Sequence, residues 1–399
     1  MKIKYLFIGF VLCMVFQYTY GQTTTEAKKP QMLINDPQLR IDIVLAINDM
    51  YNFQFDKAEQ QYDWFMQKYP EHPMPYFLKA LNTWWKILPH LGLDYREHDA
   101  AFLNYLDQTI YYAERLKKTS DDDIEAFFFL SAAYAFKGRI HGERKNWAKA
   151  IGAVKNAITY LHKGEELNQN NIELMFGRGL YNYYAVWLPN EYAMLKPVMA
   201  LFKKGDKTLG LEQLKNAALN AFYTQTEAQY FLTEIYRNEE NKPQEAFHLT
   251  EYLHKTYPEN ACFHRDFTVL CFTLGKYELV EPLSYRMLER LQAQQIGYNG
   301  IDGRYANYFL GYLEKTRGNK EKSYDFFLKA MDFAEKINAY EYGYYHSTLY
   351  NLADYAMQEK NYLKAALYYN KLKKYAKKDT IYYKDAKKFF QEHGKDIKL

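Results

Sequence analysis

Small and aromatic residues recur along this chain at a fixed spacing, and no other feature of the sequence limits its fold so strongly. In the stretch YFLGYLEKTRGNKEKSYDFFLKAM, Gly311 is followed by Ser323 and Ala330, with Phe327 between the last two. Small residues at such positions let two helices touch, and the large aromatic residue fills the space between them. Because one helix pair cannot bury its apolar face alone, neighbouring pairs must stack into a continuous core. The spacing therefore predicts an all-α chain of stacked helix pairs.

This spacing resembles that of the tetratricopeptide repeat. Three other units share the register through Ala58, Tyr62, Phe65 and Pro70; through Leu232, Tyr236, Ala246, Leu253 and Pro258; and through Leu352, Ala353, Ala365, Tyr369 and Leu372. The resemblance implies a tetratricopeptide solenoid, a right-handed α-α superhelix of about eight helix pairs followed by a C-terminal capping helix. On this interpretation the 399 residues need not form several separate domains.

Weaker units fill the gaps between these matches, and each carries an irregularity. Residues 74–118 contain Trp84 and Trp85 in a long, degenerate pair. In the next pair the second helix arrives several residues late, so we expect residues 137–146 to form an inserted loop. In a later pair, Pro282 lies inside the second helix, which we expect it to kink or shorten.

An apolar, aromatic segment with two prolines lies in the middle of the chain, between Phe176 and Leu211. We expect a helix that ends at Pro189 and an extra helix within residues 190–204. Neither apolar half is long enough to span a bilayer, which takes about 20 residues. The second helix of this pair then follows through Gly210, Leu214 and Ala217.

The order of elements in this segment is similar to that of the eukaryotic inclusion-body-clearance family of tetratricopeptide proteins. It consists of a glycine-bearing helix, Leu188-Pro189, a short apolar helix, Gly205-Asp206 and Gly210-Leu211. The resemblance covers residues 171–219 and implies a shared helical insertion rather than a shared activity. Close helix packing accounts for Gly177 and Gly179, whose G-x-G lacks the third glycine of a dinucleotide fingerprint.

The N-terminus has the pattern of a secretory signal. A basic MKIK is followed by an apolar run of about a dozen residues and by the small residues Thr19 and Gly21. We expect cleavage near Gly21 and a periplasmic or secreted protein in a Gram-negative-type envelope. An uncleaved anchor is the alternative, although the run is shorter than a bilayer span.

The expected organisation is a signal peptide at 1–21, a flexible segment at 22–36, a degenerate repeat array at 37–220, a second array at 221–378, and a capping helix with a basic tail at 379–399. The formal charge of +4 falls to about +2 once Lys2 and Lys4 are removed, which gives no argument for nucleic acid. Cys262 and Cys271 on one helix would lie about 13 Å apart along its axis. They are therefore expected to be buried free thiols, since a disulfide between them is excluded.

Motifs that would indicate catalysis, a metal or a cofactor are not found in the sequence. It contains no H-E-x-x-H, no cluster with zinc-ligand spacing and no G-x-S-x-G elbow. The nearest thing to a site is His141-Gly-Glu143-Arg144 in the expected loop. We therefore predict no enzyme, no cofactor and no metal.

The best candidate for a binding site is a set of residues on the first helices of the later repeats. Tyrosine offers a large flat contact with a polar tip, which suits recognition of an extended ligand. The candidates are Tyr305, Tyr308, Tyr312 and Lys315, with Tyr350, Asp354, Tyr230, Arg237 and Arg265. The alternative is that these rings widen the core.

The sequence predicts a non-enzymatic exported scaffold that binds a protein or peptide through its concave surface. The first alternative is a carrier of a small apolar or sugar ligand in an aromatic-lined cavity, and the second is an enzyme that uses inserted loops. A groove rich in charge would favour a peptide, whereas a closed apolar cavity would favour a lipid.

Overall fold

The computed structural model describes residues 36–119, 124–168, 171–191, 196, 200, 202–341, 343–394 and 397. Within these ranges the chain is helical and has no strand. The expected signal peptide and most of the expected extra helix at 190–204 lie outside the described residues. The described chain forms two compact units, which meet in sequence between Tyr257 and Pro258.

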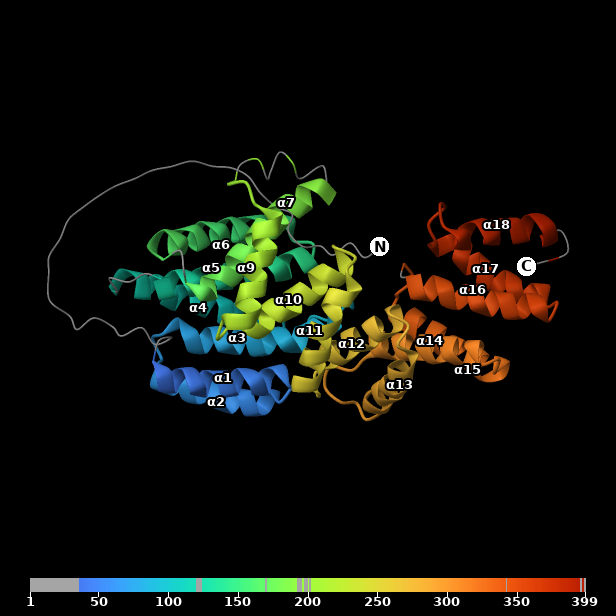
Figure 1. Ribbon diagram of the computed structural model, residues 1–399, viewed down its shortest axis with the longest axis horizontal. Coiled ribbons are helices and arrows are strands. Elements are labelled where there is room, and N and C mark those ends of the chain that lie inside the picture. The colour runs from blue at the N-terminus through green and yellow to red at the C-terminus, as the bar shows by residue number, and fades with distance from the viewer. Residues whose placement is uncertain are drawn as a thin grey trace. The chain divides into compact units, whose positions relative to one another are not determined.

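In its described residues, the N-terminal unit contains five antiparallel helix pairs (Figure 1). The pairs are α1 (Pro37–Tyr51) with α2 (Phe55–Lys68), α3 (Pro73–Ile87) with α4 (Asp99–Thr119), α5 (Ile124–Glu143) with α6 (Trp147–Leu167), α7 (Ile172–Glu191) with α9 (Lys207–Asn220), and α10 (Gln225–Asn238) with α11 (Pro243–Thr256). A short 3-10 helix, η2 (Leu88–His90), extends α3.

The C-terminal unit adds three pairs and a closing helix. These are α12 (Ala261–Thr273) with α13 (Tyr277–Gln292), α14 (Gly300–Thr316) with α15 (Lys320–Lys336), α16 (Gly343–Gln358) with α17 (Tyr362–Tyr375), and α18 (Ile381–His393). The predicted all-α array of about eight helix pairs with a capping helix is confirmed for the described residues.

The small residues of the repeat pattern lie where the helices of a pair meet. Ser323 on α15 donates its hydroxyl to the carbonyl of Gly311 on α14 at 2.7 Å. A Cβ atom on Gly311 would stand 2.9 Å from the ring of Phe327, which is fully buried. Only glycine allows this approach, so the predicted tetratricopeptide register is confirmed by the packing itself.

A close helix crossing in the N-terminal unit joins two glycines. A Cβ atom on Gly210 of α9 would lie 2.6 Å from the backbone nitrogen of Tyr183 on α7. A Cβ on Gly179 of α7 would lie 2.7 Å from Leu214 and 3.0 Å from the carbonyl oxygen of Gly210. The predicted close packing around Gly179 is confirmed, as is the second helix through Gly210 and Leu214.

The expected loop at residues 137–146 is wrong. Helix α5 continues to Glu143, and the turn that follows is confined to residues 144–146. Gly138 is a packing residue, because a Cβ there would meet a methyl group of Val154 on α6 at 2.7 Å. Residues 137–143 therefore lengthen the first helix of the pair, which is why the second helix begins late. The His141-Gly-Glu143-Arg144 motif consequently spans a helix end, where Arg144 forms a two-pronged ion pair with Asp99.

Two prolines are tolerated inside helices where the sequence predicted an end or a shorter helix. Helix α7 runs through Pro189 to Glu191, and α13 runs through Pro282 to Gln292. A proline removes one backbone hydrogen bond. The predicted end of a helix at Pro189 is therefore wrong, and α13 is not shortened at Pro282, since it has 16 residues. The predicted kink at Pro282 stays a prediction.

Helices α10 and α11 belong with the N-terminal unit, although the sequence placed a change of array at residue 220. The side chain of Glu227 on α10 accepts the indole N–H of Trp85 on α3 at 3.0 Å and the hydroxyl of Tyr51 on α1 at 3.2 Å. The hydroxyl of Tyr257, just after α11, donates to Asn48 on α1 at 2.9 Å. These contacts bring the fifth pair onto the first two.

Candidate functional site

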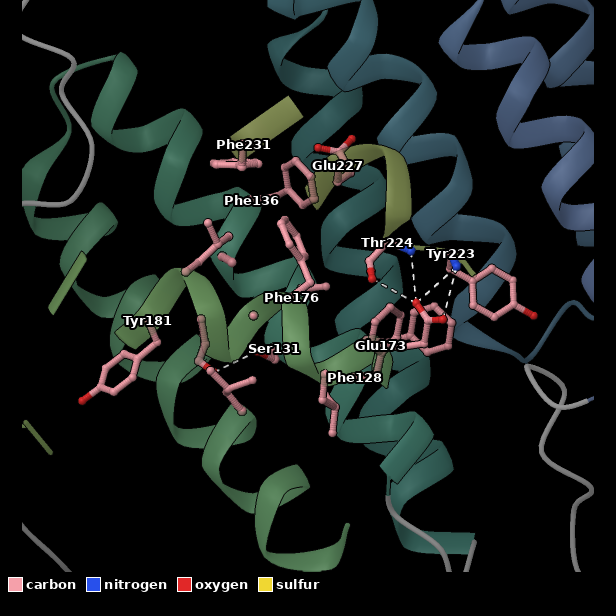
Figure 2. Close-up of a pocket in the computed structure, with 18 of the residues that line it drawn as sticks. Phe128, Ser131, Phe136, Glu173, Phe176, Tyr181, Tyr223, Thr224, Glu227 and Phe231 are labelled. Carbon is pink, nitrogen blue, oxygen red and sulfur yellow. Dashed lines mark hydrogen bonds between the residues drawn. The ribbon is translucent and has the colours of Figure 1, made fainter. Parts of the chain in front are cut away.

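A cavity of about 230 Å³ lies inside the N-terminal unit (Figure 2). Its walls come from α1, α3, α5, α6, α7 and α10, and almost all of the lining surface is apolar. Representative wall residues are Ile47, Leu81, Phe128, Phe136, Leu180 and Phe231. An apolar cavity of about 150 Å³ is enough to bind a benzene-sized molecule. The space therefore suits a larger apolar group.

The cavity results from small side chains on facing helices. Ala132 and Ala135 on α5 and Gly177 and Ala185 on α7 all line the hollow. Small residues bring helices together at the crossing points, but they leave space where the helices diverge. Because α10 is fixed to α1 and α3 by Glu227, the inner surface of the unit is enclosed on that side.

One carboxylate in the wall has a structural role. Glu173 accepts the backbone N–H groups of Phe222, Tyr223 and Thr224 at 2.7 to 3.3 Å, and the hydroxyl of Thr224 at 3.0 Å. Phe222 and Tyr223 precede α10 and Thr224 is its N-cap residue, so Glu173 satisfies backbone donors where the chain enters that helix. Figure 2 shows the hydrogen bonds from Tyr223 and Thr224 converging on the Glu173 side chain.

Two other charged side chains of the cavity wall, Glu227 and Arg139, do not cap a helix. Glu227 is buried, and burial raises the pKa of its carboxyl group, although the Trp85 hydrogen bond, the charge of Arg139 and the Tyr51 hydrogen bond act in the opposite direction. The guanidinium of Arg139 lies 4.7 Å from the ring centre of Trp84 and 5.2 Å from that of Phe231. Glu227 and Phe231 lie in the same part of the pocket in Figure 2.

The raised pKa of Glu227 predicts a pH dependence of stability. At a pH between the pKa of Glu227 in the unfolded chain and its higher pKa in the folded protein, the folded protein keeps a proton that the unfolded chain has lost. The free energy of unfolding therefore falls as the pH rises through this range. Each pH unit in this window contributes at most about 1.4 kcal/mol. We expect the wild type to lose stability relative to Glu227→Gln as the pH rises from about 4.5, until the folded pKa is passed. Urea unfolding of both proteins over a pH series measures this difference, and a difference that stays constant with pH would contradict it.

The predicted tyrosine row lies on α14 in the C-terminal unit. Tyr308 is buried, and its hydroxyl hydrogen-bonds to Ser347 of α16 at 2.9 Å. Burial raises the pKa of Tyr308 to about 12. Tyr305 and Tyr312 are half-buried. The row is part of an aromatic cluster, in which the rings of Tyr305 and Tyr308 lie 5.4 and 4.7 Å from that of Tyr344.

The polar ends of this surface are joined across helices. Lys315 donates to Asn351 at 2.6 Å and lies 3.5 Å from the carboxylate of Asp354, both on α16. Tyr350 donates its hydroxyl to Asp385 on α18 at 2.6 Å. The structure therefore brings Lys315 and Asp354 together.

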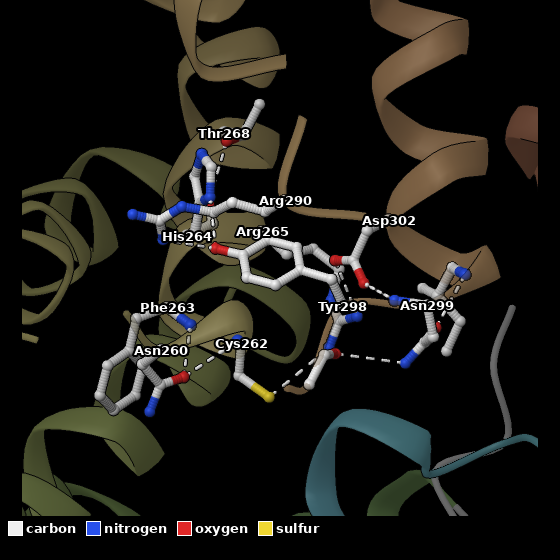
Figure 3. Close-up of polar contacts among 12 residues, drawn as sticks. Asn260, Cys262, Phe263, His264, Arg265, Thr268, Arg290, Tyr298, Asn299 and Asp302 are labelled. Carbon is white, nitrogen blue, oxygen red and sulfur yellow. Dashed lines mark hydrogen bonds and ion pairs between the residues drawn. The ribbon is translucent and has the colours of Figure 1, made fainter. Parts of the chain in front are cut away.

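The three other candidates are engaged elsewhere. Tyr230 is buried in the N-terminal unit, 5.7 Å from the ring of Trp85, and Arg237 of the same unit pairs with Glu234 at 2.6 Å. Arg265 lies in the C-terminal unit, in a polar cluster that links α12 to the start of α14 (Figure 3). Its guanidinium donates to Asp302 at 3.2 Å.

The hydrogen bond of Tyr308 gives a test of its role in the core. Tyr308→Phe removes the hydroxyl and leaves the ring, so we expect the free energy of unfolding to fall by about 1 kcal/mol. Tyr285→Phe is the matched control, because Tyr285 of α13 is exposed. Chemical denaturation compares the two variants. Equal stability of both variants would show that the Tyr308 hydroxyl contributes nothing to folding.

Sequence reasoning offered an aromatic-lined cavity as an alternative but did not locate it, and it missed Arg139 and Glu227. They lie on α5 and α10, where no binding motif occurs. A signal was nevertheless present in α5, whose apolar residues occur on all sides of the helix and include Phe127, Phe128 and Phe129. A helix that is apolar all round must be buried on every side, or must line an internal space.

Among the described residues, no group of three or more histidine, cysteine, aspartate or glutamate side chains could hold a metal ion. None of the described helices is both long enough and apolar enough to cross a membrane. Cys262 and Cys271 are buried within α12 and are not joined in a disulfide, as their spacing predicts.

No protein-family model matches the sequence, and no curated protein matches it. Three solved structures are similar in fold. The C-terminal part of a tetratricopeptide repeat-containing protein from Cytophaga hutchinsonii shares 13% identity over 73% of this chain and 95% of that one, with a TM-score of 0.35. The human IFIT1 dimer with PPP-AAAA shares 13% sequence identity over 89% of this chain and 73% of that one, with a TM-score of 0.44. The P58(IPK) tetratricopeptide domain shares 14% sequence identity over 89% of this chain and 99% of that one, with a TM-score of 0.24.

At these TM-scores the matches carry no argument about a site or an activity. The tetratricopeptide-like assignment rests on the helix pairs and their small contact residues described above. The resemblance of residues 171–219 to the inclusion-body-clearance family stays a prediction.

Proposed function

We propose that this tetratricopeptide-like protein is a non-enzymatic binding protein whose N-terminal unit holds an apolar ligand in its partly open cavity. The observation that carries the proposal is the apolar wall of a space of about 230 Å³. Binding sites for small molecules are typically concave and apolar, with a few polar groups that orient the ligand. The cavity has this composition.

This proposal favours the small-ligand alternative over a peptide held in the same place. A peptide brings backbone N–H and C=O groups that need partners, and each unpaired polar group in an apolar site costs about 1 to 3 kcal/mol. The cavity wall offers few such partners, because Glu173 is already used by the start of α10. A ligand with a hydrocarbon body has no such requirement.

The experiment is a titration of the full chain with the neutral dye Nile red, whose fluorescence rises in apolar surroundings. Ala135→Trp places a large ring in the cavity and is expected to abolish most of the signal. Ala148→Trp makes the same change at an exposed position of α6 and is expected to leave binding intact. Equal dye binding by the two variants would overturn the proposal. A smaller change, Ala132→Leu, serves if Ala135→Trp fails to fold.

A second candidate is a protein or peptide partner on the C-terminal unit. Lys315 is held by its contacts with Asn351 and Asp354 on the helix next to the half-buried Tyr305 and Tyr312. Side chains that are already held in place lose little conformational entropy when a partner binds, which supports this surface. Affinity capture from the cell envelope, with wild type compared with Tyr312→Ala, tests this surface. A captured protein that is retained equally by both would exclude it.

We also propose export to the periplasm or the exterior, on the basis of the signal pattern at residues 1–21. The exported protein should then begin near Gln22. N-terminal sequencing that finds Met1 retained would contradict cleavage.

A further inference from the structure

Among the described residues that line the cavity, Arg139 is the one with a positively charged side chain. It lies on α5, one helical turn beyond Ala135, and its side chain is half-buried. Among the described residues it forms no ion pair and no hydrogen bond, and its Nε–H is buried without an acceptor. A buried donor without an acceptor is costly, which makes this group a strong candidate to meet a ligand.

The aromatic neighbours of Arg139 do not satisfy its donors. The guanidinium carbon of Arg139 lies over the rings of Trp84 and Phe231, which attract the positive charge by cation–π interaction. The N–H bonds of the guanidinium group form a planar fork that matches a carboxylate. The two rings hold the positive charge but supply no acceptor oxygen, and the described residues leave the Nε–H group without an acceptor.

Glu227 does not accept a hydrogen bond from the guanidinium group of Arg139. Its Oε1 atom accepts from Trp85 and Tyr51, which commits the side chain to α3 and α1. Its carboxylate is not within ion-pair distance of Arg139 in the described structure, although the two charges influence each other. The acidic side chain of Glu227 in the same wall favours a ligand head with a single negative charge over one with two, because negative charges of the head and of Glu227 repel each other.

We propose that the cavity binds an apolar chain that ends in a carboxylate, and that Arg139 binds this carboxylate. The inference rests on the proposed function, because the hydrocarbon part must occupy the cavity. The chemical class is a monocarboxylate with a hydrocarbon tail. The tail lies among Phe128, Phe136 and their neighbours, and the head meets the guanidinium group of Arg139.

The test is displacement of Nile red from the full chain by ligands with one tail and different heads, used below the concentrations at which they form micelles. The probes are decanoate, methyl decanoate, decyl phosphate and decyltrimethylammonium, near neutral pH. We expect decanoate to displace the dye at about tenfold lower concentration than methyl decanoate, which corresponds to one charge-assisted contact. Decyl phosphate and the cation should be weaker than decanoate.

Arg139→Met keeps an unbranched apolar side chain and removes the charge and the donors. It should weaken decanoate about tenfold and leave methyl decanoate unchanged. Lys155→Met removes one positive charge from an exposed position of α6 and should change neither ligand. Arg139→Lys, which keeps the charge but not the planar fork, should fall between wild type and Arg139→Met, and it serves if the methionine variant does not fold.

The possible failures are distinguishable. If methyl decanoate and decanoate bind equally to wild type, or if Arg139→Met does not affect decanoate, the head-group assignment is wrong and the apolar cavity stands. If decyl phosphate binds more tightly than decanoate, the head is a phosphate and the carboxylate assignment is overturned. If none of the four probes displaces the dye, both this inference and the proposed function fail.

Discussion

Replacing Gly210 by alanine is expected to reduce the free energy of unfolding of the N-terminal unit by about 3 kcal/mol. The added Cβ would lie 2.6 Å from the backbone nitrogen of Tyr183 and 2.9 Å from the carbonyl oxygen of Gly179. Both atoms belong to the backbone of α7, so no side-chain rotation can relieve the contact. The helices must separate, and the buried contact of Leu214 with α7 is then loosened as well.

The control is the same substitution at Gly152 of α6. A Cβ atom there meets nothing within 4 Å, so Gly152→Ala should stabilise the protein by about 0.5 to 1 kcal/mol through helix propensity alone. Urea denaturation followed by circular dichroism gives both values. If Gly210→Ala were as stable as Gly152→Ala, the close crossing of α7 and α9 would be wrong.

Asp302→Ala is expected to destabilise the C-terminal unit by about 3 to 5 kcal/mol. Asp302 is fully buried, pairs with Arg265 at 3.2 Å and accepts the backbone N–H of Asn299 at 2.9 Å, which completes a capping box at the start of α14. Burial raises the pKa of Asp302, and the charge of Arg265 opposes this. The pair itself therefore contributes little, but removing one partner leaves the other charge in a buried site.

Two comparisons separate the cap from the ion pair. Asp302→Asn keeps an acceptor for the Asn299 N–H and loses the charge, so its loss of stability should be smaller than that of the alanine variant. Asp332→Ala breaks an exposed pair with Lys336 on α15 and should cost less than about 0.5 kcal/mol. Hydrogen exchange in α14 locates the effect. If α14 in Asp302→Ala were as well protected from hydrogen exchange as in the wild type, the contacts of Asp302 would not stabilise this helix.

Local spacing was sufficient to predict the repeat and its contact residues. Gly311, Ser323 and Phe327 lie where the register places them, and their contacts involve only the two helices of one pair. The same reasoning gave the packing at Gly179 and the buried thiols of α12. Such contacts join residues that are close in sequence, so the helical period alone brings them together.

The same local reasoning went wrong in two places. The late start of the second helix suggested a loop at residues 137–146, and Pro189 suggested the end of a helix. Residues 137–143 instead continue α5, where Gly138 packs against Val154, and α7 extends past its proline to Glu191. The deciding partner is another helix, which residue type alone does not identify.

The sequence by itself determined the helix pairs and the face on which Tyr305, Tyr308 and Tyr312 lie, because a helix repeats every 3.6 residues whatever surrounds it. Only the tertiary structure decided that α16 covers Tyr308, and that α10 meets α1 and α3 through Glu227. The contact between Glu227 and Tyr51 joins residues separated by 176 positions. The cavity and the surroundings of Arg139 depend on such long-range packing, because periodicity states which residues share a face and not what lies opposite that face.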